Sequence, residues 1–136
     1  MSTSLLHHAF GVRGYIHQRT EFVGGEIHFT VEQPSRGLRC SACRCRDVIR
    51  RGGRRRRFRG LPIGRRPVWI ILWVPRLECT RCRAVRQAAV SFATGQHRYT
   101  RRFARYVLDL ARHMTMSDVA RHLGISWNLV KAHNHL

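Results

Sequence analysis

Residues 67–82, PVWIILWVPRLECTRC, decide how this chain folds, because they join an apolar strand directly to a pair of cysteines. The segment 68–74 is rich in β-branched and aromatic residues and lies between two prolines. Such a run is typical of a central strand that is buried on both faces, and it is too short to span a bilayer. Cys79 and Cys82 follow within a few residues. The sequence therefore predicts a sheet with a cysteine pair at one end.

A second cysteine pair precedes this strand. Cys40 and Cys43 share the CxxC spacing of Cys79 and Cys82, and each pair has a leucine two residues before its first cysteine. Two CxxC turns can supply four thiolates to one tetrahedral Zn²⁺. The alternatives are inert buried thiols or a redox site, but a redox CxxC needs one motif in a β-α-β setting, and no helix-forming run follows the first pair. We predict a Zn²⁺ site of these four cysteines, with Cys45 as a spare thiol.

Further strands are indicated on both sides of these cysteines. Residues 25–33 alternate apolar and polar side chains, which predicts a half-buried strand, and 85–92 has the composition of another. Together with 68–74 they predict a small, mostly antiparallel, zinc-ribbon-like sheet within residues 1–96. Because so small a core contributes little, the metal would supply much of the folding free energy.

The charge of the chain is its strongest compositional signal. Lys and Arg total 26 against 7 acidic residues, which gives a net charge of +19. Lys131 is the only lysine. This charge favours polyanions, and the planar guanidinium suits phosphate and guanine, but anionic membranes would attract it as well. No secretory signal is recognisable, so we expect a cytoplasmic protein.

The charge is densest in residues 50–60, which read RRGGRRRRFRG. Gly52 and Gly53 predict a turn here, Gly60 the exit from a loop, and Phe58 a core position. A solvated loop is the plain alternative, but repulsion within the tetrad of arginines is costly without a counter-anion. We therefore predict phosphate contacts, which provide affinity rather than sequence choice, from Arg54, Arg55, Arg56 and Arg57.

The last third of the chain has the periodicity of helices. Residues 100–114 carry one apolar stripe at helical spacing, with Thr100 as the expected N-cap. A second helix is predicted to begin near Ser117 as its N-cap and to end at Gly124. The sequence thus predicts two helices before the final segment.

The final segment has the spacing of a helix-turn-helix. Ala120 lets two helices approach, Gly124 takes the turn, and Val130 packs back from the last helix. The alternative is a helical hairpin that only packs or that dimerises. For Trp127, packing in the core and contact with a thymine methyl group are equally compatible with the sequence. On this basic background we predict DNA contacts, and the residues expected to make them are Ser126, Trp127, Asn128 and Lys131.

The chain resembles the N-terminal part of the ISL-three family of bacterial insertion-sequence transposases in LRCSAC, in the arginine-rich run, in FRGLPIGRRPVWIILWVPRLECTRC and in HRYTRRFARYVLDLARHMTMSDVARHLGISWNLVK. The resemblance covers about residues 11–131. It implies that the zinc-binding region and the helix-turn-helix recognise double-stranded DNA at the terminal inverted repeats of the element. It also implies a much larger ribonuclease-H-like domain that performs strand transfer with three acidic residues and divalent metal.

The acidic residues of this chain do not match that catalytic domain. All seven are scattered, and none lies in a βα framework that could bring three carboxylates together. We therefore expect an α+β protein that is not itself an enzyme: a truncated transposase fragment with a zinc-binding β region (1–96) and a three-helix helix-turn-helix region (97–136) whose last turn frays. It would be associated with the nucleoid, and its partners would be DNA, full-length transposase or a second copy, with no membrane.

Three alternatives to this function stay open. A stand-alone zinc-stabilised protein could bind RNA through the arginine-rich run, or it could serve as a protein-interaction module whose helices pair with copies of themselves. The chain could also take part in an enzyme if another chain supplied the catalytic domain. Competition between single-stranded RNA and duplex DNA, and a nicking assay with Mg²⁺, separate these readings.

Overall fold

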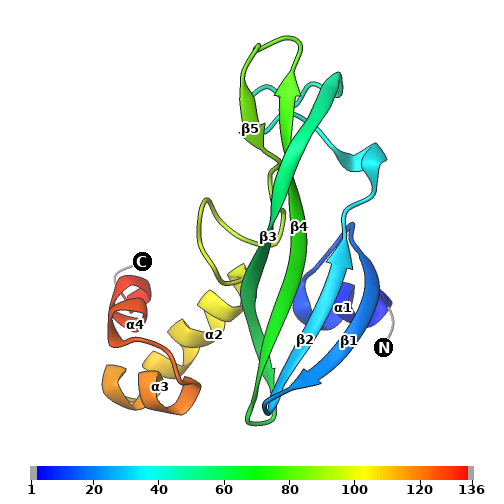
Figure 1. The fold of residues 1–136 in the computed structure, drawn as a ribbon. Helices are drawn as coiled ribbons and strands as arrows, with labels where there is room; N and C mark the ends of the chain where they lie inside the picture. The colour runs from blue at the N-terminus through cyan, green and yellow to red at the C-terminus, as the bar shows by residue number, and fades with distance from the viewer. Residues whose placement is uncertain (1–2, 135–136) are drawn as a thin grey trace.

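The computed structural model describes residues 3–134, without the side chains of 131–134, and shows an α+β fold (Figure 1). Among these residues no helix is long and apolar enough to cross a membrane. The elements in chain order are α1 (Thr3–Phe10), β1 (Ile16–Val23), β2 (Glu26–Glu32), η1 (Ser35–Gly37), β3 (Val48–Ile63), β4 (Arg66–Cys79), β5 (Val85–Gln87), α2 (Arg101–Ala111), α3 (Met116–Leu123) and α4 (Trp127–Asn134).

The sheet is mixed, which corrects the expectation of a mostly antiparallel one. Its strand order is β1-β2-β4-β3, and β5 pairs with the end of β4. β2 runs parallel to β4, whereas the other three pairings are antiparallel. The parallel pair arises because the chain leaves β2, passes through the first cysteine turn and enters β3 on the far side of β4. β4 thereby obtains a neighbour on each edge, as predicted for a central strand, but it is not buried on both faces, because Trp73 keeps 56% of its surface exposed on the face opposite the core.

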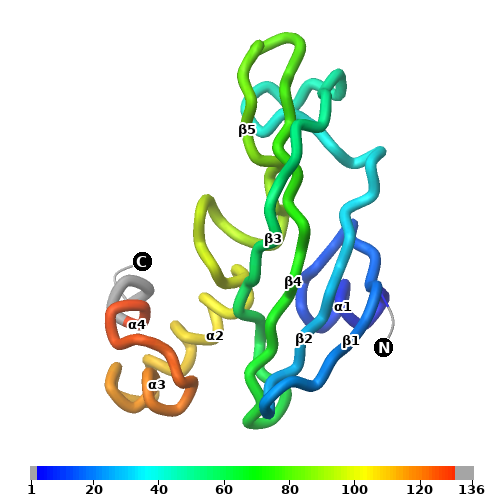
Figure 2. The backbone as a smooth tube through the Cα atoms, in the orientation of Figure 1, coloured from blue at the N-terminus to red at the C-terminus, as the bar shows by residue number. Residues whose placement is uncertain are grey.

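The arginine-rich run is part of a strand, and the prediction of a loop with a turn at Gly52-Gly53 was wrong. β3 pairs with β4 over most of its length, and the two glycines lie at a β-bulge between Arg50 and Gly53. Gly60 lies within the strand and not at a loop exit. Arginine can occupy a strand because its long apolar stem covers neighbouring side chains while its charge reaches the edge. The β3–β4 hairpin spans the molecule from the cysteine turns to the helical region (Figure 2).

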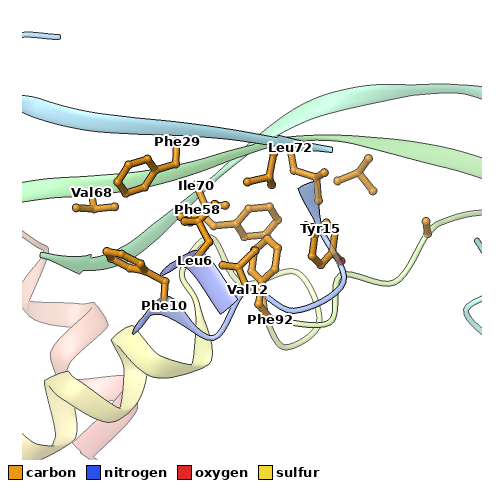
Figure 3. Close-up of a cluster of buried hydrophobic side chains, with 14 of the residues drawn as sticks. Leu6, Phe10, Val12, Tyr15, Phe29, Phe58, Val68, Ile70, Leu72 and Phe92 are labelled. Atoms are coloured by element: carbon orange, nitrogen blue, oxygen red, sulfur yellow. The ribbon is translucent and has the colours of Figure 1, made fainter. Parts of the chain in front are cut away.

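The main hydrophobic core lies on one face of this sheet. α1, which the sequence did not reveal, covers that face with Leu6 and Phe10, together with the irregular segment around Phe92 (Figure 3). Phe58 is fully buried there, as predicted. The strand predicted for 85–92 is confirmed only for β5, because the following residues leave the sheet and fold into the core.

A second hydrophobic cluster holds the three C-terminal helices together. Its buried members come from α2, α3, α4 and the segment before α2, and they are Tyr99, Phe103, Val107, Val119, Leu123 and Val130. Thr100 caps α2 by accepting a hydrogen bond from the Phe103 N–H at 3.1 Å, as predicted. α3, however, is capped by Thr115, whose hydroxyl accepts from the Asp118 N–H at 3.1 Å. The predicted cap at Ser117 was wrong, because the helix begins earlier.

Candidate metal centre and nucleic-acid interface

The four cysteines of the two CxxC motifs meet at the end of the β3–β4 hairpin. Their sulfur atoms all lie within 4.8 Å of one another. The Sγ atoms of Cys40 and Cys82 are 3.9 Å apart, and those of Cys43 and Cys79 are 3.6 Å apart. Zn–S bonds of about 2.3 Å in a tetrahedron place sulfurs roughly 3.8 Å apart, whereas a disulfide requires about 2.05 Å. The cluster therefore has the dimensions of a site that could hold a metal ion.

The two cysteine turns have the same backbone geometry. The residue after each pair, Arg44 or Arg83, has a positive φ of 63° or 55°. In each turn the N–H of this arginine donates to the carbonyl of the first cysteine, at 2.9 Å and 2.8 Å. In the second turn the Cys82 N–H also points at Cys79 Sγ, 3.4 Å away. These turns aim two sulfurs at one point, and the repeated Leu-x-Cys-x-x-Cys pattern was the only sign of them in the sequence.

The pKa values of the cysteine thiols differ strongly within the cluster. Backbone N–H groups of Cys43 and Ala42 lower the pKa of Cys40 to about 6, and those of Cys82 and Arg81 lower that of Cys79. For Cys43 the N–H of Cys45 acts in the same direction, but the neighbouring sulfurs and burial outweigh it and raise the pKa to about 12. Ionisation of the first thiols thus opposes ionisation of the next, and a divalent cation removes that opposition.

The surroundings of the cluster connect the two turns. Thr80 lies inside the second turn, and Asp47 follows the first turn. The Thr80 hydroxyl donates a hydrogen bond to the Asp47 carboxylate at 2.9 Å. Cys45 lies outside the group of four, and its sulfur accepts the Asp47 N–H at 3.4 Å. This arrangement supports the four-cysteine set without a fifth ligand.

The helix-turn-helix has the predicted turn. Gly124 adopts a left-handed φ of 65° at the end of α3, and its N–H donates to the Ala120 carbonyl. Ser126 then caps α4, because its hydroxyl accepts the Leu129 N–H at 3.2 Å. Val130 is fully buried against the other helices. The packing fixes the first turn of α4 at the surface of the helical region.

The residues predicted to read DNA lie at that first turn. Ser126, Trp127 and Asn128 are exposed, and Trp127 keeps 43% of its surface accessible. The N-terminal turn of the second helix is the part of a helix-turn-helix that approaches base edges. Lys131 lies one turn further along α4, and its side chain lies outside the described residues.

The four consecutive arginines of β3 divide between the two faces of the sheet. Arg54 and Arg56 pair with Val74 and Leu72 and share the core face, whereas Arg55 and Arg57 occupy the other. Their environments therefore differ, although the sequence shows them as one charged run.

The divided arginines also differ in what they touch. Arg56 is only 9% exposed and lies over the Phe58 ring, and burial, followed by repulsion from Arg54 and Arg98, lowers its pKa. Arg57 lies over the Trp69 ring, 4.4 Å from its centroid. Arg54 and Arg55 are exposed and have no ion-pair partner among the described residues.

All four arginines nevertheless line one groove across the free edge of β3. The groove has a volume of about 460 Å³, and the segment before α2 closes its other side with Gln96 and Arg98. The guanidinium groups face few carboxylates: Arg57 reaches Glu26 at 4.0 Å, the one ion pair described in the groove. Arg98 is a member of this site that sequence reasoning missed, because it lies far along the chain from the arginine run. The groove offers a strongly positive seat for an anion such as phosphate.

Arg59 joins this sheet to the helical region. Its guanidinium donates to the Leu123 carbonyl at the end of α3, at 2.6 Å, and lies 5.2 Å from the Phe103 ring centroid. Its backbone N–H and carbonyl pair with Arg98 and Thr100. The basic groove and the helix-turn-helix are consequently fixed to the same stretch of β3.

Comparison with known proteins identifies the helical part. A family model described as the helix-turn-helix domain of transposase family ISL3, the ISL-three family named above, matches residues 79–132. Neither the curated proteins nor the solved structures contain a match to this chain. The matched residues begin at the second cysteine turn and include α2, α3 and most of α4. Residues 79–132 are therefore similar to the helix-turn-helix domain of the ISL3 transposase family, which supports a helix-turn-helix in this part of the chain.

Proposed function

We propose that this protein binds the terminal inverted repeats of an insertion sequence as duplex DNA, without strand-transfer activity of its own. The observation that carries the proposal is a helix-turn-helix of a transposase family whose reading turn is exposed, fixed through Arg59 to a groove lined by five arginines. Phosphate contacts in the groove would supply affinity and register, and α4 would supply base readout.

The metal in this proposal is Zn²⁺ bound by Cys40, Cys43, Cys79 and Cys82. An all-sulfur tetrahedral set favours Zn²⁺ over hard cations such as Mg²⁺ or Ca²⁺. The ion would play a structural role, because four protein ligands leave no open position for substrate. It would hold the end of the long hairpin closed and so stiffen the part of β3 that carries the groove.

The same proposal assigns separate roles to the two regions of the chain. Residues 1–96 would form the metal-stabilised scaffold with most of the phosphate groove, and residues 97–136 would form the reading unit and add Arg98 to the groove. Within the reading unit, Ser126, Trp127, Asn128 and Lys131 would contact DNA; a bidentate Asn128–adenine contact is worth about 1–3 kcal/mol of discrimination.

Selection from a random-core duplex library tests this function. We expect the full chain to enrich one sequence motif, and Asn128→Ala to lose preference at one base position while keeping affinity for unrelated duplex. Arg54→Ala should instead weaken all duplexes alike and reduce the salt slope by about 0.9 for each lost phosphate contact. Absence of an enriched motif, or tighter binding of single-stranded RNA than of duplex, would overturn the proposal.

Strand transfer is tested separately. With Mg²⁺ and the enriched duplex we expect no nicked product from this chain alone. A nicked product that disappears on removal of Mg²⁺ would show a catalytic site that the proposal denies.

A further inference from the structure

The face of the sheet opposite the core carries a second groove beside the basic one. It has a volume of about 520 Å³ and crosses the sheet from β1 to β3. Its floor is Ile71 in β4, and Trp73 stands beside it with 56% of its surface exposed. A large aromatic side chain so exposed in the middle of the central strand is not needed for the core.

The β-bulge of β3 shapes the seat of this tryptophan. A side chain at Gly53 would place its Cβ 2.9 Å from Trp73 Nε1 and 2.5 Å from the Val74 carbonyl oxygen. Only glycine leaves room there, so the indole lies against bare backbone on one side. Its remaining surface is open to solvent, which makes it a platform for a flat ligand.

The charges around the platform are mainly positive. Arg19, Arg50 and Arg55 line the groove, against a single acid, Glu32. Arg19 pairs with Glu21 at 3.1 Å, and Glu32 accepts a hydrogen bond from Gln18 at 2.7 Å. The ligand that complements this surface is an aromatic group joined to an anion.

Arg55 connects the two grooves. It is the cross-strand partner of Trp73, and it lines both the basic groove at the edge of β3 and the groove on the open face. A nucleic-acid backbone that leaves the basic groove over Arg55 would bring its next base onto the indole. Paired bases cannot do this, because their faces are stacked within the duplex.

We propose that Trp73 stacks on a base of an unpaired nucleotide whose phosphate is bound by Arg55, in addition to the duplex contacts of α4. This inference rests in part on the proposed function, since the strand reaches Trp73 from the basic groove. DNA and RNA share the required chemistry, a base linked to a phosphodiester.

Removing the tryptophan side chain and the bases, separately and together, tests this proposal. Binding of the full chain to labelled hexathymidylate and to the same backbone without bases is measured by fluorescence anisotropy, for wild type, Trp73→Ala and Phe22→Ala. Phe22 is a matched control, because it is 75% exposed and does not line the groove. Melting temperature and metal content establish that each variant is folded.

We expect wild type to prefer the base-containing strand by roughly 5- to 150-fold, the range for stacking of one base on an aromatic side chain. Trp73→Ala should lose this preference, and Phe22→Ala should keep it. Equal binding of both strands by wild type, or an unchanged preference in Trp73→Ala, would overturn the inference. Displacement of hexathymidylate by hexaglutamate with the same dependence on Trp73 would also overturn it, since the site would then be one for an acidic peptide.

Two further measurements distinguish RNA from DNA as the bound strand, and this inference from the proposed function. Hexauridylate in place of hexathymidylate identifies RNA or DNA as the preferred unpaired strand, and either result supports the base-stacking site. Duplex binding by Trp73→Ala should stay within about two-fold of wild type. If wild type did not bind duplex DNA, the proposed function would be refuted. The preference of wild type for the base-containing strand would still test the stacking site at Trp73 independently.

Discussion

Replacement of Arg59 by alanine should separate the helical region from the sheet more than any other single arginine substitution. The Arg59 side chain is 9% exposed and burial lowers its pKa, yet it stays charged at neutral pH. It donates to the Leu123 carbonyl and lies over two rings, with centroids 5.2 Å (Phe103) and 5.7 Å (Trp69) away.

The size of the effect follows from these contacts. A hydrogen bond to a charged group contributes about 1.5–3 kcal/mol, and a partly desolvated guanidinium over aromatic rings about 0.5–2 kcal/mol. Removal of Arg59 also removes the free-energy cost of burying its charge, which offsets part of this sum. We therefore expect a net loss of about 2 kcal/mol in the free energy of unfolding. For a chain of this size that corresponds to a fall in melting temperature of roughly 8 °C.

Thermal unfolding followed by circular dichroism measures this loss, with Arg55→Ala as the matched control. Arg55 lies on the same strand but is exposed, so its replacement should change stability by less than about 0.5 kcal/mol. Arg59→Met keeps much of the apolar stem, and we expect it to be intermediate. Amide exchange in α3 should quicken in Arg59→Ala. Equal melting of Arg59→Ala and Arg55→Ala would refute the view that Arg59 ties the two regions together.

Three other predictions concern the metal cluster and the helix caps. Cys79→Ser should lose the bound metal and unfold the cysteine end of the sheet, since structural zinc contributes on the order of 10 kcal/mol, whereas Cys45→Ser should retain it; metal analysis with thermal melting distinguishes the two. Metal affinity should depend more steeply on pH below about 6 than above it, because Cys40, with its lowered pKa, must then also release a proton to bind; a titration with a competing chelator that showed no such change in slope would contradict this. Thr115→Ala should destabilise α3 by about 1 kcal/mol and Ser117→Ala by less than half of that, as measured by urea unfolding, and the reverse order would restore Ser117 as the cap.

The duplicated CxxC motifs show how far local spacing can predict structure. The sequence shows the same cysteine turn twice, once before the arginine-rich run and once after the apolar strand, and the structure brings the four sulfurs within 4.8 Å of one another. The helix-turn-helix could be predicted equally well, because the hydrogen bonds of Gly124 and Ser126 are made to residues only three or four positions away. Whether the cluster holds Zn²⁺ stays a prediction, as do the DNA contacts.

The arginine run shows where such reasoning fails. Composition and Gly52-Gly53 indicated a loop, but β4 has backbone N–H and C=O groups to satisfy on its second edge, and β3 pairs with them. Long-range pairing therefore overrode local preference, and it placed Arg56 and Arg57 over the rings of Phe58 and Trp69.

The sequence by itself determined the features that depend on neighbours along the chain: the cysteine turns, the central strand, the three C-terminal helices and the tight turn between α3 and α4. Only the tertiary structure decided the mixed strand order, the division of the arginines into buried and exposed ones, and the joining of Arg98 to the β3 groove. The physical reason is that a guanidinium's environment depends on which distant ring, carbonyl or arginine folding brings to it, and spacing along one strand does not contain that information.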